Sequence, residues 1–353
     1  MGIGKFISKP LKYPLIAFYI FARCLLRGPS SRDIRLNLAG VMPPPGSKKI
    51  VHGGKVKLLH LRERFGDSWR KFNIGYFVSS GLPFAPAIWI KIYKFFGVKI
   101  VWNQNGVAYP ALYSPEIIRS INDLYVPMQL SDYVIYQTKF TKSCADEYLG
   151  VFSGPSSILI NPVDTGHFIP RAIPLPLKPL VLIMLGNHLE SEERLLVVTR
   201  AIRSLRNKGV ITKLIIIGQS DRNFDEEWIE KRGTYLQKDA PALFQSAHIF
   251  IHLKYLDPCP TTVEEALSCG LPVIGCQNGG IPELVNEQSG VLIPVVEDFE
   301  KLHYPSADEV AGAIEQIRAN YSEYSRSARE SASRFDKEDW LKKHEEIFQK
   351  LCP

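Results

Sequence analysis

Two carboxylates, Asp257 and Glu265, stand eight positions apart in the segment 257–283, DPCPTTVEEALSCGLPVIGCQNGGIPE. The pattern predicts a loop and then a helix start between them. A helix N-terminus offers unpaired backbone N–H groups and a partial positive charge, which favour anions. Pro258 and Pro260 stiffen the loop before that helix. We interpret the arrangement as a site in which N–H groups hold a diphosphate while the two carboxylates accept hydrogen bonds from sugar hydroxyls.

Helix capping offers a second interpretation of the same residues. Thr261 with Glu264, and Thr262 with Glu265, both fit the capping-box pattern at a helix start. Gly270 suits a left-handed residue at the helix end. On the local sequence alone, Glu265 therefore stays open between a structural cap and a ligand contact.

The complete spaced pattern resembles the donor-site signature of the retaining glycosyltransferases of the GT-B fold, in the family 4-like group also called glycosyl transferases group 1. That signature is an acid, seven residues, Glu-Ala, a small residue with Gly-x-Pro-Val, and Gly-Gly-x-x-Glu. This sequence has Asp257, then Glu265 and Ala266, then 269–273 and 279–283. The first acid of the family is usually Glu, and the shorter Asp could alter the choice of donor.

The resemblance implies roles for individual residues. Glu265 would hold the nucleotide ribose, and Asp257 would face the donor sugar. Backbone N–H groups of Thr261 and Thr262 would approach the diphosphate. With Arg194 added, Asp257 and Glu265 form the expected catalytic set, and the resemblance implies no metal and no cofactor besides a UDP- or GDP-sugar donor. The expected donor-binding residues are Pro260, Thr261, Thr262, Gly186, Asn187, Gly218, Tyr235 and Leu236.

One stretch departs from the family pattern. Family members usually place an Arg and a Lys after the first strand of the C-terminal domain to neutralise the diphosphate. Here residues 186–196, GNHLESEERLL, offer the basic residue Arg194 among several glutamates, with His188 as a partial substitute. Like charge near a diphosphate weakens binding and transition-state stabilisation. Either Arg194 or a cation of the N-terminal half serves instead, or catalysis is weak or absent.

A second polar cluster, on the expected acceptor side, follows a predicted strand in the N-terminal half. The amides of Asn103, Gln104 and Asn105, with Gly106, could bind sugar hydroxyls, although an Asn-Gly turn explains them as well. Gly53 and Gly54 end a basic loop that could meet a phosphate of the donor or acceptor, or could simply be solvated.

Predicted strands and helices alternate through both halves of the chain, which is typical of parallel, doubly wound α/β sheets. We expect the GT-B fold: two Rossmann-like domains whose parallel sheets face each other across a cleft, with a C-terminal helix that crosses back to the N-terminal domain. In open sheets of this kind, ligands bind at the carboxyl ends of the strands. The expected parts are an interfacial segment 1–32, an acceptor domain 33–170, a linker 171–180, a nucleotide-sugar domain 181–335 and a final helix 336–353.

The N-terminal end is strongly basic. Residues 1–72 hold 15 Lys and Arg against 3 Asp and Glu, a surplus of +12 in a chain of net charge +7. An apolar stretch follows Lys12, but its roughly 13 residues are too few for a span, which takes about 20. We favour a helix lying in the membrane interface over a signal peptide, a helix packed on the domain surface or a merely solvated basic face.

Together these features predict a hexosyltransferase for polysaccharide biosynthesis, membrane-associated and cytoplasmic, on the inner face of the membrane. Its partners would be a nucleotide-sugar donor and a glycan or lipid-linked acceptor. Six isolated cysteines without metal spacing suit reduced thiols in the cytosol. The main alternative is a catalytically silent nucleotide-sugar-binding or scaffold subunit. An epimerase of the same fold fits the paired acids less well, and the basic end carries no nucleic-acid-binding motif, so we expect no nucleic acid partner.

Overall fold

The computed structural model describes residues 9–26, 33–39, 55–188, 192–219 and 224–353 of the 353-residue chain. Its contacts divide the chain into two compact units. The first unit holds the described residues up to 108, with 113–159 and 340–353. The second unit holds 109–112 and 160–339. Among the described helices, none is long and apolar enough to cross a membrane.

The first unit is built on a sheet of five parallel strands that follow one another in chain order. The strands are β1 (Leu36–Asn37), β2 (Ile74–Val78), β3 (Lys99–Gln104), β4 (Tyr133–Tyr136) and β5 (Ser156–Ile158). The helices of this unit are α1 (Lys9–Leu25), α2 (Val56–Phe65), α3 (Pro86–Phe95), α4 (Pro115–Tyr125), α5 (Lys139–Leu149) and α12 (Lys337–Leu351).

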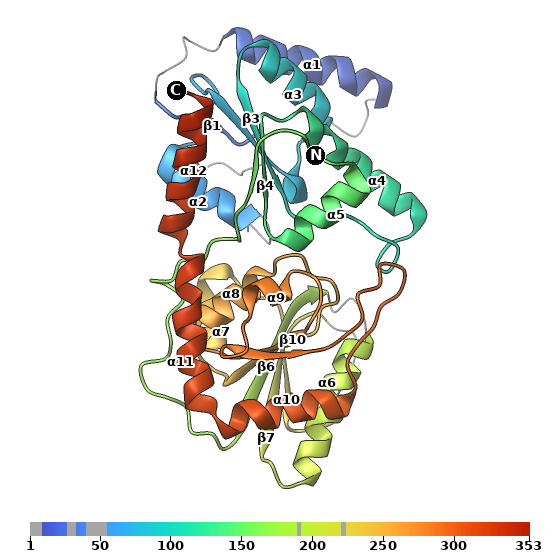
Figure 1. Cartoon of the computed structure of the whole chain (residues 1–353), viewed down its shortest axis with the longest axis vertical. Coiled ribbons are helices and arrows are strands. Elements are labelled where there is room, and N and C mark those ends of the chain that lie inside the picture. The colour runs from blue at the N-terminus through green and yellow to red at the C-terminus, as the bar shows by residue number, and fades with distance from the viewer. Residues whose placement is uncertain (1–8, 27–32, 40–54, 189–191, 220–223) are drawn as a thin grey trace. The chain divides into compact units, whose positions relative to one another are not determined.

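Helices cover both faces of this sheet. Because successive side chains of a strand point to opposite faces, each strand packs against helices on both sides. On β2, Tyr76 packs with α2 and α12 on one face, whereas Phe77 packs with α1 and α3 on the other. Val101 and Trp102 of β3 divide in the same way. Figure 1 shows α2 beside α12, and α1 beside α3. A strand that is buried on both faces reads as a continuous apolar run.

The last helix, α12, packs in the first unit although it follows the second unit in the chain. Trp340 and Phe348 are buried in the cluster on the α2 face of the sheet. His344 is fully buried, and its Nε2 atom lies 3.0 Å from the hydroxyl of Tyr76. The expected return of the C-terminal helix to the N-terminal sheet is confirmed.

The second unit has a six-stranded parallel sheet with the strand order β11-β10-β9-β6-β7-β8. In chain order within the unit this is 6-5-4-1-2-3, the doubly wound Rossmann order, whose direction of winding reverses between β6 and β9. The strands are β6 (Leu180–His188), β7 (Thr212–Gln219), β8 (Ile229–Arg232), β9 (Ile249–His252), β10 (Val273–Cys276) and β11 (Gly290–Ile293). The helices are α6 (Glu192–Asn207), α7 (Ala240–Phe244), α8 (Thr261–Ser268), α9 (Ile281–Leu284), α10 (Ala307–Ala319) and α11 (Tyr321–Ser331).

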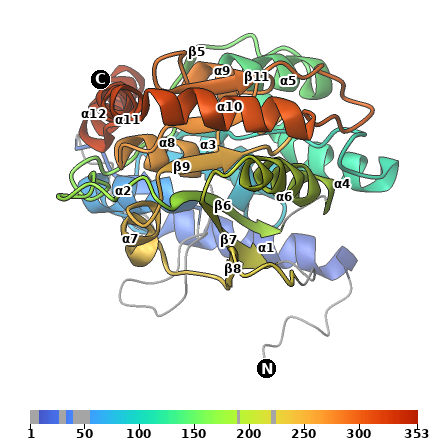
Figure 2. The same ribbon diagram turned by 90° about the horizontal axis from the view of Figure 1, so that it is seen from below.

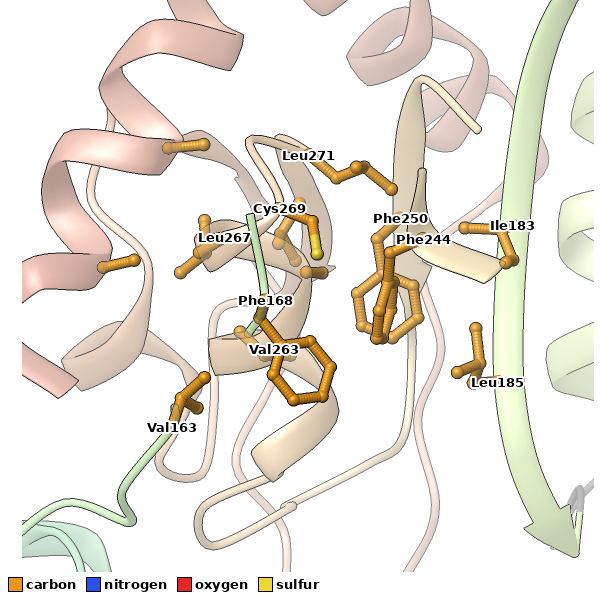
Figure 3. Packing of buried hydrophobic residues seen from close by; sticks show 14 of the residues in the cluster. Val163, Phe168, Ile183, Leu185, Phe244, Phe250, Val263, Leu267, Cys269 and Leu271 are labelled. Carbon is orange, nitrogen blue, oxygen red and sulfur yellow. The ribbon is translucent and has the colours of Figure 1, made fainter. Parts of the chain in front are cut away.

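Two separate cores cover the faces of this second sheet. Leu182 of β6 packs against α6 and α10, which lie side by side (Figure 2). Ile183 faces the opposite core, where α8 contributes Val263 and Leu267 (Figure 3). Phe250 of β9 completes that second core. The core therefore fixes α8 against the sheet along its length, and with it the position of the residues at the start of the helix.

Three features differ from the sequence-based picture. The contact division falls after Leu159, so the segment 171–180 lies inside the second unit, where its proline-rich chain leads into β6. Helix α4 was not predicted, although Pro115 at its first position is a typical start. Strand β8 was also missed, because its sequence IEKR is charged and only partly buried, and so carries no apolar run.

Candidate functional site

The candidate site of the second unit lies at the carboxyl ends of β6 and β9, where the sheet changes its direction of winding. Strand β9 ends at His252, and the chain then runs through residues 253–260 to the first turn of α8. Strand β6 ends at His188 and leads towards α6. The loop after β9 therefore carries Asp257, and the helix that follows β6 carries Arg194 in its first turn.

Asp257 is a buried, ionised carboxylate surrounded by positive charge. The residue is 8% exposed, and its Oδ2 atom lies 3.3 Å from Nε2 of His252 and 3.6 Å from Nζ of Lys254. Burial alone would raise its pKa, but Lys254, His252 and the charge of Arg194 outweigh burial and hold the pKa at about 2. An ionised carboxylate can only accept hydrogen bonds, which suits contact with hydroxyl groups.

Arg194 lies within the first turn of α6 and is 4% exposed. Its charge acts on Asp257 and on His252, and in both cases it lowers the pKa. Burial is the larger cause of the lowered pKa of His252, so this ring is neutral at pH 7 despite its carboxylate neighbour. The structure thus brings the predicted cation and the predicted first acid into one cluster.

Glu265 presents the opposite electrostatic state. It is 3% exposed, and its Oε1 atom accepts a hydrogen bond of 2.6 Å from Nε2 of Gln237. Desolvation raises its pKa to about 8, and the Gln237 contact offsets this only in part. Desolvation raises the pKa of Tyr235, and coulombic repulsion from the ionised form of Glu265 raises it further. A buried carboxyl with one amide donor has acceptor capacity that two ribose hydroxyls would satisfy.

The two capping boxes predicted at the start of this helix are wrong, whereas Gly270 after its end has the expected left-handed conformation, with φ +75°. The N-cap residue is Pro260, whose side chain cannot cap, and Thr261 is already the first helical residue. Glu264 accepts a hydrogen bond of 3.1 Å from the thiol of Cys259, and Glu265 faces Gln237. The helix therefore begins one residue earlier than a Thr261 cap requires. Because Glu265 does not serve the helix start, its burial calls for another explanation.

A close backbone contact fixes the loop that carries Asp257. Gly279 has φ +63°, and a Cβ atom there would lie 2.9 Å from the carbonyl oxygen of Asp257 and from backbone atoms of Leu256. The next residue, Gly280, donates its N–H to the same carbonyl of Asp257 at 2.9 Å. Leu256 itself has φ +48°, a region that non-glycine residues rarely occupy. The Gly-Gly pair is thus explained as the support of the Asp257 loop.

The other expected donor-binding residues lie around the same edge of the sheet. Gly218, with φ +125°, is near the end of β7, and Gly186 and Asn187 are near the end of β6. Thr261 and Thr262 are half-buried in the first turn of α8. Before α7, in the stretch that also holds Gln237, Tyr235 is half-buried and Leu236 is exposed.

In the first unit, the predicted amide cluster forms an internal network at the end of β3. Asn103 accepts a hydrogen bond of 2.6 Å from the buried ammonium of Lys57 and donates to the hydroxyl of Tyr76 at 3.1 Å. Gln104 accepts from the indole N–H of Trp102 and donates to the carbonyl of Gly106. Both amides therefore already use their donor and acceptor atoms within the protein.

Asn105 is the member of this cluster that stays half-buried. Its Oδ1 atom accepts from Lys57 at 2.9 Å, and its Nδ2 atom donates to Ser80 at 2.5 Å. The same Oδ1 atom also accepts a hydrogen bond from Gln137, so the side chain of Asn105 is engaged within the protein as those of Asn103 and Gln104 are. Gly53 and Gly54 lie outside the described residues.

Sequence reasoning missed four polar residues of these two clusters: His252, Lys254, Gln237 and Lys57. His252 and Lys254 precede Asp257 in the segment HLKYLD, directly after an apolar strand, so the rule that polar residues at strand ends approach a ligand could have found them. Gln237 and Lys57 carry no such signal, because tertiary packing brings each of them to its partner.

Residues 167–333 match the family described as glycosyl transferases group 1. A relative from Escherichia coli K12, named "Putative colanic acid biosynthesis glycosyltransferase WcaL", is 28% identical over 179 residues, 44% of this chain and 44% of the relative. The protein of the same name from Salmonella typhimurium LT2 is 28% identical over 149 residues, 37% of this chain and 36% of that protein. The match to these relatives spans less than half of their length.

Solved structures resemble the chain over most of its length at low identity. The sucrose-phosphate synthase of Thermosynechococcus elongatus has a TM-score of 0.59 at 15% identity, covering 83% of this chain and 76% of that chain. A glycosyltransferase from Rickettsia africae ESF-5 has a TM-score of 0.58 at 16% identity, covering 88% and 84%. Anabaena Alr3699/HepE, in complex with UDP and glucose, has a TM-score of 0.59 at 14% identity, covering 85% and 83%. The chain therefore carries the GT-B fold, and residues 167–333, which lie in its second unit, match the glycosyl transferases group 1 family.

Proposed function

We propose that this chain is a glycosyltransferase that moves a hexose from a nucleotide diphosphate sugar to a hydroxyl group of a glycan or lipid-linked acceptor, with retention of the anomeric configuration. One observation carries the proposal. The carboxyl groups of Asp257 and Glu265 are both buried at the carboxyl edge of the doubly wound sheet, with opposite electrostatic states. Neither is used as a helix cap, and such an edge is where α/β sheets bind ligands.

In this proposal the two acids divide the donor between them. Glu265 accepts hydrogen bonds from the ribose, and Asp257 accepts them from the hexose. The N–H groups of Thr261 and Thr262, at the positive end of α8, hold the diphosphate. When the bond between the anomeric carbon and the diphosphate breaks, negative charge grows on the leaving phosphate, and preorganised N–H groups and cations lower the energy of that charge.

Two side chains are candidates for the missing basic pair of the family. Arg194 and Lys254 both neutralise Asp257, whose lowered pKa registers their charge. Lys254 is the more accessible, with a third of its side chain exposed. We propose that Lys254 makes the main contact with the diphosphate. Arg194, which is buried in the cluster, makes this contact only in part.

For the donor, UDP-sugars are the first choice within this proposal. UDP is named in the complexes of Anabaena HepE and of the pneumococcal O-GlcNAc transferase GtfA, both of which share the fold. For the acceptor, the relatives named for colanic acid biosynthesis favour a growing polysaccharide or its lipid-linked precursor. We further propose that the protein acts at the inner face of the membrane and contacts the membrane peripherally through its basic N-terminal end.

A silent nucleotide-sugar-binding subunit is the second candidate, and the acidic stretch 186–196 favours it. The two candidates are separated by a donor-hydrolysis assay over a panel of UDP- and GDP-sugars, with and without acceptor extract. If the chain is an enzyme, wild type should slowly hydrolyse one donor. This activity should be lost in Asp257→Asn and kept in Glu323→Gln, a control at an exposed site. Tight binding of a sugar nucleotide without any turnover by the wild-type chain would instead establish the silent subunit.

A further inference from the structure

Helix α1 exposes a face that is apolar throughout. Leu15, Phe18 and Leu25 are 51%, 74% and 62% exposed, and their spacing places them on one side of the helix. The opposite side carries Ile20 and Cys24, which are buried in the core of the first unit. A helix that merely covers a domain turns charged and polar residues outwards. The exposed positions of α1 that the structure describes, from Tyr13 to Leu25, carry no charged side chain, and the half-buried Arg23 stacks on the ring of Trp69.

Helix α3 and the loop before it extend the same surface. Phe95 of α3 is 75% exposed, and its ring centroid lies 6.1 Å from that of Phe21 on α1. Phe84 is 49% exposed, and its ring lies 5.1 Å from that of Tyr13. Figure 1 shows α1 and α3 packed side by side. We call this surface the α1–α3 apolar face; its main members are Leu15, Phe18, Leu25, Leu26, Phe84 and Phe95.

The charged residues of the chain segments that form this face are all basic. The sequence contains no Asp or Glu in residues 1–32 or 68–115, the stretches that contain α1 and α3. The guanidinium of Arg23 lies 3.7 Å from the ring centroid of Trp69, and Lys91 projects from α3 at an exposed position. An apolar face with basic residues beside it is complementary to an anionic lipid surface, because acyl chains accept the rings while headgroups attract the cations.

We propose that the α1–α3 apolar face is a docking surface for an anionic lipid bilayer, on which α1 lies flat with its outward side among the acyl chains. This deepens the peripheral contact in the proposed function and does not depend on the reaction. With 17 residues, α1 is short of the roughly 20 that a span requires. Tyr13 and Tyr19, each almost half exposed, have the amphipathic rings that favour the headgroup region.

Flotation of the full chain with lipid vesicles tests the proposal. One set of vesicles contains phosphatidylcholine, and the other contains phosphatidylcholine with phosphatidylglycerol. The wild-type chain is expected to float with the anionic vesicles and much less with the neutral ones. The double variant Phe18→Ser, Phe95→Ser loses two exposed rings and should partition roughly a hundredfold less, about tenfold for each ring. Ile173→Ser, an equally exposed site in the second unit at 75%, should float like wild type.

Three outcomes would overturn the proposal. The wild-type chain could stay unbound with both vesicles, or the double variant could float as well as wild type. Alternatively, light scattering could find a wild-type dimer that the double variant abolishes, with no flotation, and a second copy would then be the occupant. Circular dichroism should show the same fold for all variants. Donor hydrolysis without vesicles separates this test from the proposed reaction, because a failed docking surface leaves it unchanged.

Discussion

Replacing Glu265 by Gln should stabilise the protein, and the gain should grow with pH. The folded chain raises the pKa of this carboxyl from 4.5 to about 8, chiefly by desolvation. A raised folded pKa contributes stability that is complete below the unfolded pKa and is lost as the pH rises through the folded pKa. Gln has the same shape, keeps an oxygen for Gln237 and carries no charge. The variant therefore avoids the decrease in unfolding free energy that wild type shows as the pH rises above 5.

The size of the effect follows from the two pKa values. The unfolding free energy of wild type is lower than that of a chain with fully protonated Glu265 by roughly 1 kcal/mol at pH 5 and by on the order of 3 kcal/mol at pH 7. For a unit of this size, 1 kcal/mol moves the melting temperature by about 2–4 °C. Calorimetry should therefore show the advantage of Glu265→Gln growing by roughly 4–8 °C between pH 5 and pH 7.

The control is Glu323→Gln on the exposed side of α11, whose effect should be the same at every pH. An advantage of Glu265→Gln that stays constant or shrinks as the pH rises would refute the argument that a buried, desolvated carboxyl stands at this position. Such a result would also remove the reason for assigning Glu265 to a ligand.

Three further predictions concern the same edge of the sheet. Gly279→Ala should lower the unfolding free energy by on the order of 2–3 kcal/mol in chemical denaturation, because the new Cβ would meet the backbone of Leu256 and Asp257 at positive φ. The control Gly312→Ala on α10, which has open space around it, should be neutral or slightly stabilising in the same assay. Thr261→Pro removes one N–H group at the start of α8, and the helix should tolerate it because the preceding residue, Pro260, is already extended. Calorimetric titration should show that the affinity for a nucleotide diphosphate falls about tenfold, while the melting temperature is unchanged. Thr261→Ala keeps the N–H group and should keep the affinity. Lys254→Met should slow donor turnover roughly tenfold or more, and equal rates in wild type and variant would remove Lys254 from the diphosphate contact.

Much of the fold followed from the sequence because its signals are local. Apolar runs such as LVLIMLG and KLIIIG predicted the strands buried on both faces, and the glycine after α6, with φ +85°, marked its end. The charged edge strand β8 had no such signal, and the register of α8 was set by tertiary contacts. The capping pattern of Thr261 and Glu264 predicts a helix start one residue too late, because the core fixes Val263 and Leu267 inwards.

The donor motif was found from spacing, but its electrostatics was not. That Asp257 is ionised and Glu265 is neutral at pH 7 depends on Lys254, Arg194 and Gln237, which come from three separate segments. The hydrogen-bond partners of the amide cluster after β3 could not be predicted from the sequence either. Its residue types suggested sugar contacts, yet the buried ammonium of Lys57 and neighbouring side chains already occupy most of their hydrogen-bonding atoms.

The central claim is that Glu265 and Asp257 bind different parts of one nucleotide sugar, and a paired calorimetric titration tests it most directly. Wild type, Glu265→Gln and Asp257→Asn are each titrated with UDP and with UDP-hexoses, and with the GDP series in parallel. The account predicts that Glu265→Gln weakens binding of both the free nucleotide and its sugar conjugate. Asp257→Asn should weaken only the conjugate. Equal losses for both ligands in both variants, or no binding of either nucleotide series by wild type, would contradict the account.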